Sequence, residues 1–209
     1  MGELISMNDE ITRHISWDEH IEKGLYELLG GLGEEDSYIN EEHTKETPRR
    51  FTEALKEYTS GYLTDPIELL NKSFTEGKYN QMLFQNDISF ISHCMHHLAP
   101  FAGKVHFGYI PNGKLIGLSK IPRLIDVLSS RLQIQERLSD QIVGYFSEVL
   151  NPLGCGVVIE AVHFCICARG VKKIGSYTRT SSLRGIFLTN PETKAEFLSG
   201  AVSKESSLL

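Results

Sequence analysis

Hydrophobic residues at the start of the chain recur at the three- and four-residue spacing of an amphipathic helix. Ser16 and Glu19 form a capping-box pattern, which predicts that the first helix begins at Ser16. Its apolar positions are Ile21, Leu25, Leu28, Leu29 and Leu32, and the glycines 30, 31 and 33 end it. A second helix is predicted from about Thr47, with Pro48 in its first turn. Residues 61–80 predict a short helix followed by a loop.

From Gln81 the spacing of apolar residues changes to two, which is typical of half-buried strands. One strand is predicted around residues 88–92 and the next at residues 104–110, where Val105, Phe107 and Tyr109 share a face. The turn sequence Pro111-Asn112-Gly113 then leads to a third short strand at residues 115–118. These segments predict a meander of antiparallel strands.

The helical spacing returns at Ser119, which can cap a helix whose apolar positions extend to Leu132. A further helix is predicted from Gln135 to Leu150, and the sequence Asn151-Pro-Leu-Gly ends it. Two more strands follow, a long one from Gly156 to Cys167 and another at about residues 174–187. Residues 191–198 predict a short closing helix.

This order of elements indicates an α+β fold, with an antiparallel four-stranded sheet, helices on one face and an N-terminal helical extension. The corresponding domains are an N-terminal helical region at residues 1–80, a sheet-containing domain at 81–200 and a loose tail at 201–209. A small sheet leaves edges and one face uncovered, and association with further subunits is a common remedy.

The composition, 41% hydrophobic and 23% charged, is that of an ordinary globular protein. The chain lacks an apolar run long enough for a membrane helix and the layout of a secretory signal, so we expect a cytoplasmic protein without membrane attachment. Residues 1–60 hold six basic against fifteen acidic residues, and the remainder holds fifteen against twelve. This acidic N-terminal region argues against nucleic acid as a partner.

The five residues His93 to His97, with the sequence HCMHH, concentrate candidate metal ligands. Cys94 and His97 are three residues apart, so one turn can offer a thiolate and an imidazole to the same ion. If residues 157–167 form a strand, His163, Cys165 and Cys167 share a face and can supply a third ligand. Three ligands indicate a catalytic zinc ion and four indicate a structural one. The alternative is that these thiols are ordinary core residues.

Two basic segments are candidates for binding an anion. Ser119, Lys120 and Arg123 lie on the first turn of a predicted helix, where free N–H groups also favour phosphate. Arg169, Lys172 and Lys173 follow the predicted long strand. For each segment the alternative is a solvated basic turn.

Glu136 is a candidate for base recognition, because a carboxylate can accept the two parallel N–H donors of guanine. The alternative is an ordinary acidic residue in the first turn of a helix.

Four motifs, taken together in their order along the chain, resemble those of the zinc-dependent GTP cyclohydrolase I family. They are SHCMHHLAPFAGKVHFGYIP, GLSKIPR, RLQIQERL and IEAVHFCICARGV, and the resemblance extends from about Thr47 to Phe197. It implies the opening of the imidazole ring of GTP, loss of formate and formation of 7,8-dihydroneopterin triphosphate. It also implies the tunnelling fold and a homodecamer with active sites at subunit interfaces.

Residue by residue, the resemblance implies that Cys94, His97 and Cys165 bind Zn²⁺, which activates water for attack on C8 of guanine. His96 and His163 match the family's acid–base histidines, and Ser119 matches its serine near the ribose. The residues that match those binding the triphosphate are Lys120, Arg123 and Arg169, and those that match the guanine-recognising pair are Gln135 and Glu136. Cys155 and Cys167 are not among the implied ligands.

Met95 is the one departure within the first motif, where the family usually has Cys-Glu-His-His. A thioether carries no charge and accepts hydrogen bonds weakly. Three alternatives follow: a working GTP cyclohydrolase I, a related GTP-processing enzyme with an altered product, or a non-catalytic relative that binds guanine nucleotide.

Overall fold

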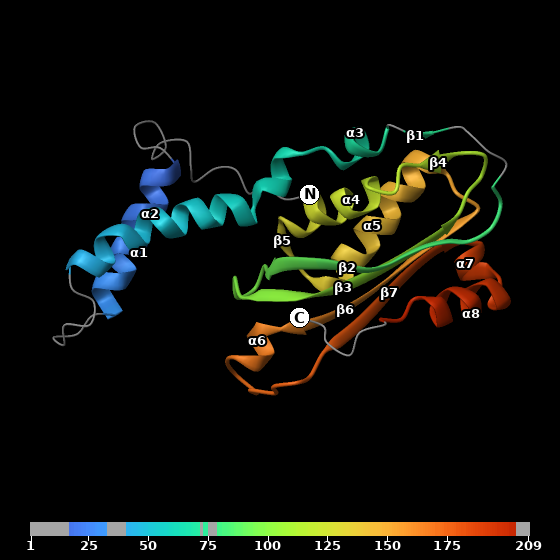
Figure 1. Ribbon diagram of the computed structural model, residues 1–209. Helices are drawn as coiled ribbons and strands as arrows, with labels where there is room; N and C mark the ends of the chain where they lie inside the picture. The colour runs from blue at the N-terminus through green and yellow to red at the C-terminus, as the bar shows by residue number, and fades with distance from the viewer. Residues whose placement is uncertain (1–16, 33–40, 72, 75–78, 204–209) are drawn as a thin grey trace, which may run out of the picture. The chain divides into compact units, whose positions relative to one another are not determined.

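The computed structural model describes residues 17–32, 41–71, 73–74 and 79–203 (Figure 1). The chain forms two compact units that divide between Glu57 and Tyr58. The segment from Tyr58 to residue 80, which the sequence pattern groups with the N-terminal helices, belongs to the second unit. The predicted helix start at Ser16 and residues 204–209 of the predicted tail lie outside the described residues.

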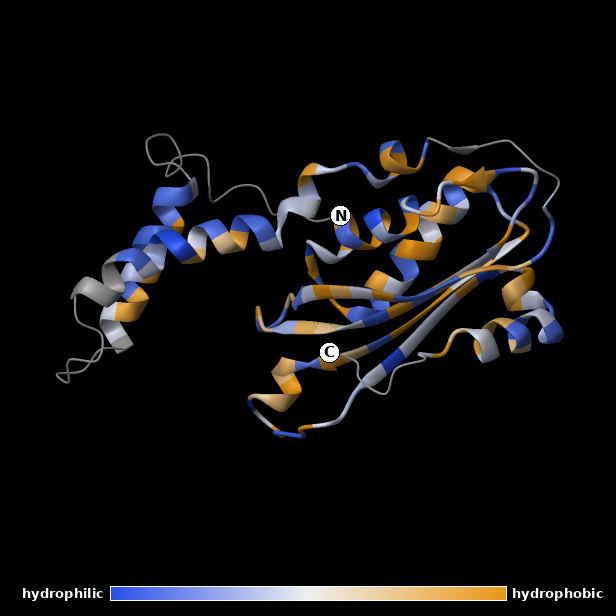
Figure 2. Ribbon diagram, in the orientation of Figure 1, coloured by the Kyte–Doolittle hydropathy of each residue, from blue (hydrophilic) through white to orange (hydrophobic). Residues whose placement is uncertain are grey.

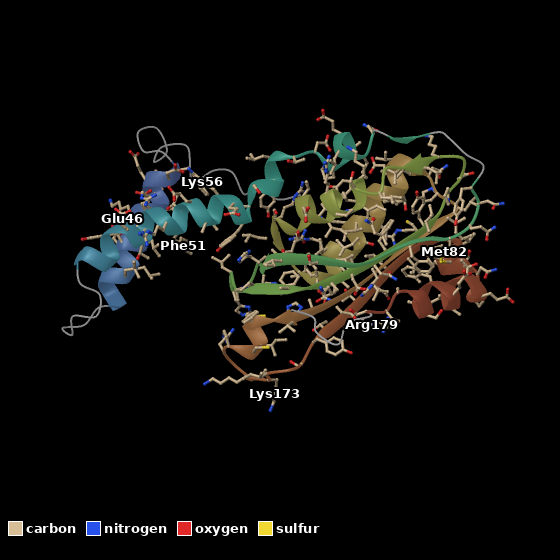
Figure 3. All side chains as sticks on the ribbon, in the orientation of Figure 1. Glu46, Phe51, Lys56, Met82, Lys173 and Arg179 are labelled. Atoms are coloured by element: carbon tan, nitrogen blue, oxygen red, sulfur yellow. The ribbon has the colours of Figure 1, made fainter. Side chains whose placement is uncertain are left out.

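The first unit contains α1 (Trp17–Leu32) and all of α2 (Glu41–Tyr58) except its last residue. An ion pair between Lys56 and Asp18 links the two helices. Figure 3 labels Lys56 on α2, together with Glu46 and Phe51 of the same helix. The prediction that Pro48 lies in the first turn of the second helix is wrong, because α2 begins at Glu41. Proline lacks the N–H that would bond four residues back, and the helix continues past this one missing bond.

The second unit holds the remaining elements. The helices are η1 (Ser60–Leu63), α3 (Pro66–Leu70), α4 (Lys120–Ser129), α5 (Gln135–Leu150), α6 (Phe164–Cys167), α7 (Ile186–Thr189) and α8 (Pro191–Gly200). The strands are β1 (Ser73–Phe74), β2 (Leu83–Cys94), β3 (Pro100–Ile110), β4 (Leu115–Ile116), β5 (Leu132–Gln133), β6 (Gly154–His163) and β7 (Thr178–Gly185). The predicted helix at 135–150 is confirmed. No helix in the described ranges is long and apolar enough to cross a membrane.

The main sheet has five strands in the order β5-β2-β3-β6-β7, so the prediction of four strands is wrong. Adjacent strands of this sheet pair antiparallel, except that β5 pairs in parallel with the end of β2. β5 has only two residues, which is too short to show a spacing of two in the sequence. A separate pair is formed by β1 and β4.

Helices cover both faces of this sheet, which corrects the prediction of helices on one face (Figure 1). On one face α4 and α5 pack through Leu124, Leu128 and Phe146 against inward-facing strand residues such as Val157. On the other face α7 and α8 pack against Val158, its neighbour in sequence, which points the opposite way. Figure 2 shows hydrophobic colour along stretches of the central strands and of α5.

The predicted strand from Gly156 to Cys167 is wrong at its end, because β6 stops at His163. The chain then makes one helical turn, α6, in which the Ala168 N–H donates to the carbonyl of Phe164 at 2.8 Å. Helical spacing replaces strand spacing from this point, so Cys165 and Cys167 no longer share a face. The last predicted strand is likewise shorter, since residues from Ile186 onward form α7.

Candidate functional site

Cys94 is the last residue of β2, and the chain turns back to β3 directly after it. The carbonyl of Cys94 accepts from the N–H groups of His97 at 3.3 Å and of Leu98 at 2.8 Å, which forms a single tight turn. Leu98 adopts a φ of 54°, an unfavourable conformation for a side chain with a Cβ. The turn brings His97 Nδ1 to 3.8 Å from Cys94 Sγ.

The α6 turn brings a second thiol to the same place. The ligand atoms of Cys94, His97 and Cys165 all lie within 4.8 Å of one another. One buried, one partly buried and one exposed residue provide these atoms, so the set is open to solvent on one side. Two thiols and an imidazole with an open position are a donor set that suits a catalytic zinc ion.

The two remaining thiols and the imidazole of His93 make other contacts or are buried in the core. Cys167 Sγ lies 3.4 Å from the carbonyl of Lys173, within the loop that follows α6. Cys155 is fully buried, and this burial raises the pKa of its thiol to about 11. The imidazole of His93 stacks on the ring of Tyr58, with centroids 4.0 Å apart. None of these three side chains belongs to the group of converging ligand atoms.

The thiol of Cys94 disfavours ionisation of the neighbouring Cys165 thiol. Burial raises the pKa of Cys165, and the neighbouring Cys94 thiol raises it further, whereas the positive charge of Arg169 partly lowers it. Metal ligation requires thiolates, and a bound cation reverses this preference by attracting both negative charges. The chemistry of the donor set therefore fits a metal ion.

The ligand group opens into a cavity of about 260 Å³ between the β2–β3 turn, the start of α5 and the end of β6. The cavity is lined by the three ligand residues and by four further candidates from the sequence, His96, Gln135, Glu136 and His163. Glu136 is exposed and lies in the first turn of α5, where the helix dipole favours a carboxylate. The cavity thus combines a metal-binding group, two further histidines and an acceptor for N–H donors.

His163 is held in the cavity by a hydrogen bond and by a stacking contact. Its Nε2 lies 2.7 Å from Gln135 Oε1, and its ring stacks on Phe101 at a centroid distance of 4.8 Å. Burial lowers its pKa, and the negative charge of Glu136 partly opposes that shift.

The basic candidates do not lie in this cavity. Lys120 and Arg123 line a different hollow, which is bordered by Leu63 to Asp65, Glu68 and Leu69. Ser119 precedes α4, but its hydroxyl makes no capping hydrogen bond, which corrects the predicted cap. Arg169 lies in the exposed loop after α6. One copy of the chain therefore does not gather all the predicted site residues around one cavity.

The cavity is also lined by residues that no sequence motif indicates, namely Phe101, Gln133, Ile134, Ile166 and Thr178. Phe101 stands opposite His163 in the β3–β6 register, and only that register shows that the two rings meet. Gln133 lies on β5, whose two residues carry no recognisable spacing.

Met95 does not line the cavity, although both of its neighbours do. Its side chain is 44% exposed, and its backbone N–H donates to the carbonyl of Gln133 at 3.0 Å. Any residue other than proline can make that backbone bond, so the turn does not depend on the side chain at this position.

Comparisons with known proteins agree with the motifs. A family model described as GTP cyclohydrolase I matches residues 21–202. A GTP cyclohydrolase 1 from Campylobacter curvus is 46% identical over 181 residues, which cover 87% of this chain and 94% of the relative. One from Leptospira biflexa is 47% identical over 178 residues, covering 85% and 96%. One from a Synechococcus strain is 49% identical over 172 residues, covering 82% and 74%.

A solved structure, the archaeosine synthase QueF-Like in its apo form, covers 53% of this chain with a TM-score of 0.42 and 16% identity. This similarity is too distant to assign a fold.

Proposed function

Because this chain belongs to the GTP cyclohydrolase I family, we propose that its cavity is the guanine and metal half of a GTP cyclohydrolase I active site. The activity is hydrolytic opening of the guanine imidazole ring of GTP, with release of formate and rearrangement to 7,8-dihydroneopterin triphosphate. The observation that carries the assignment of residues is the convergence of three ligand atoms within 4.8 Å beside His163 and Glu136.

Cys94, His97 and Cys165 would hold the metal, and their sulfur and nitrogen donors favour Zn²⁺. When bound, a zinc ion supplies Lewis acidity and lowers the pKa of water at the open position. His96 and His163 line the same cavity and are the candidates for proton transfer to and from the opening ring.

Glu136 is the candidate for recognition of the base. Its carboxylate can accept both N1–H and N2–H of guanine in a parallel pair of charge-assisted hydrogen bonds. It is exposed at the cavity, so a purine can reach it without displacing the core.

The triphosphate would be held by Lys120, Arg123 and Arg169, with Ser119 near the ribose. Since Lys120 and Arg123 line a separate hollow, we propose that they serve the cavity of a neighbouring copy. This proposal agrees with a homo-oligomer in which exposed edge strands, such as β7, continue the sheet into the next subunit. The tunnelling fold, a decamer and a cytoplasmic location are part of the same proposal.

Incubation of the purified protein with GTP tests the activity. We expect formate and, after oxidation and dephosphorylation, fluorescent neopterin, and neither product from His163→Asn. Consumption of GTP with retention of the formyl group would indicate a related enzyme with an altered product. Binding of GTP without turnover by the zinc-loaded protein would indicate a non-catalytic relative.

Co-expression of two inactive variants tests the shared site. Chains with His163→Asn and chains with Lys120→Ala should regain part of the activity in mixed assemblies, because some interfaces combine two intact halves. The pair His163→Asn and Cys165→Ala is the control, since both changes lie in the same half. Recovery in the control pair, or none in the first pair, would contradict sharing.

A further inference from the structure

The side-chain amide of Gln135 is buried and its nitrogen is fully engaged. The residue is 1% exposed, although it lines the cavity. Its Nε2 lies 3.0 Å from the carbonyl oxygen of Ile159, 3.1 Å from that of Thr178 and 3.1 Å from Thr180 Oγ1. Two amide protons thus face three acceptors, two of which are carbonyls that can only accept. This arrangement fixes which end of the amide points toward the strands.

The opposite end of the amide points at His163. Gln135 Oε1 lies 2.7 Å from His163 Nε2, and an amide oxygen can only accept a hydrogen bond. His163 Nε2 must therefore carry a proton. In a neutral imidazole only one nitrogen is protonated, so Nδ1 is the nitrogen with the free lone pair.

A second contact holds the ring in this orientation. The ring of Phe101 lies parallel to that of His163, with an angle of 2° between the planes. Phe101 is completely buried and cannot easily move. Within the described residues, Nδ1 of His163 has no hydrogen-bond partner, so it is the ring nitrogen left for a substrate in the cavity.

We propose that Gln135 is a positioning residue: it holds His163 in the Nε2–H tautomer, so that Nδ1 exchanges the proton with the substrate, and its own amide does not read guanine. This inference rests on the proposed function, because it names the part that Gln135 and His163 take in it. His163 accepts a proton at Nδ1 or returns it there, while the Nε2–H bond to Gln135 stays in place. Of Gln135 and Glu136, the two residues that match the family's guanine-recognising pair, only Glu136 then binds the base.

Gln133 provides a matched control. It is also 1% exposed and lines the same cavity, and its amide bonds to the carbonyl of Leu128 and to Gln141. It makes no contact with His163. Gln133→Leu therefore removes a buried amide near the cavity without releasing the histidine.

Steady-state kinetics with GTP and with inosine triphosphate, which lacks the 2-amino group, separate positioning from recognition. We expect Gln135→Leu and Gln135→Met to lower kcat at least about tenfold, with KM and the preference for GTP unchanged. Glu136→Gln should instead reduce the preference for GTP. A raised KM or a reduced preference for GTP in either Gln135 variant would overturn the proposal.

Nitrogen-15 NMR of labelled histidines gives a readout that does not depend on activity. The His163 resonances, identified by their loss in His163→Asn, should report the Nε2–H tautomer in the wild type and in Gln133→Leu. They should report a mixture in Gln135→Leu. An Nδ1–H tautomer in the wild type would overturn the proposal even if the enzyme converts GTP. Absence of turnover with the expected tautomer would contradict the proposed function instead.

Discussion

The imidazole of His163 lies parallel to the phenyl ring of Phe101, with centroids 4.8 Å apart and an angle of 2° between the planes. The two residues stand opposite each other in the register of β3 and β6. Phe101 also meets Phe90 edge to face at 5.7 Å, which ties it into the core formed with α4 and α5. The orientation of His163 is therefore fixed by the core of the second unit.

Phe101→Leu removes this stacking surface. We expect a loss of about 1 to 2 kcal/mol in the free energy of unfolding, from the smaller side chain and the lost ring contacts. We also expect a lower kcat for GTP, because the His163 ring gains freedom to turn. Urea denaturation and steady-state kinetics on the same preparation measure both effects.

Phe107→Leu is the control for the previous change. Phe107 is equally buried on the same strand and contacts Phe146 and Tyr109 but not His163. It should lose similar stability while kcat stays near the wild-type value. Equal losses of kcat in the two variants would show that Phe101 acts only through general stability.

Cys165→Ala and Cys167→Ala should differ in metal content. Cys165 lies within the converging ligand group, whereas the Cys167 thiol points to the carbonyl of Lys173. We expect about one zinc per chain in the wild type and in Cys167→Ala, and a large loss in Cys165→Ala. Elemental analysis of the purified, dialysed proteins measures the zinc content. If Cys165→Ala retained zinc and Cys167→Ala lost it, the wrong thiol would be assigned as the ligand.

The buried imidazole of His106, which does not line the cavity, should make the stability of the protein depend on pH. Its side chain is completely buried on the face of the sheet that carries α8, with Nε2 3.8 Å from Glu160. Burial lowers its pKa, Asp87 and Glu160 partly raise it, and Arg179 and Lys104 lower it further. Arg179, labelled in Figure 3, also lies 3.5 Å from Glu160. His106 is thus held in its neutral form.

Because the folded pKa of His106 is depressed, the unfolded chain takes up the proton first as the pH falls below about 6.5. The free energy of unfolding should therefore decrease from pH 7.5 to pH 5.5. His106→Gln, which cannot titrate, should show a shallower decrease. Urea midpoints across this range measure the two slopes, and equal slopes would remove His106 from the explanation.

Met95→Glu restores the residue that the family usually carries. The Met95 side chain is exposed and does not line the cavity. We therefore expect unchanged zinc content, a change in unfolding free energy within about 0.5 kcal/mol, and a change in kcat/KM of less than about tenfold. A larger gain in kcat/KM would show that a carboxylate at this position contacts the metal ligands or the substrate.

The sequence by itself determined the features that depend on neighbours along the chain. The helix at 135–150 follows from the spacing of its apolar residues, and Cys94 and His97 meet because they lie three residues apart in one turn. The four motifs likewise identify the family without any knowledge of the geometry.

The family motifs implied Cys165 as the thiol that joins Cys94 and His97, but only the tertiary structure shows the physical reason. On a strand, Cys165 and Cys167 would have been equivalent, and the helical turn α6 separates them. The contact of Gln135 with His163 also needed the packing of α5 on β6 and β7, and that of Phe101 needed the strand register. Such contacts join residues distant in sequence, so local spacing and propensity carry no information about them. They arise from burial of the shared core, which the whole unit forms together.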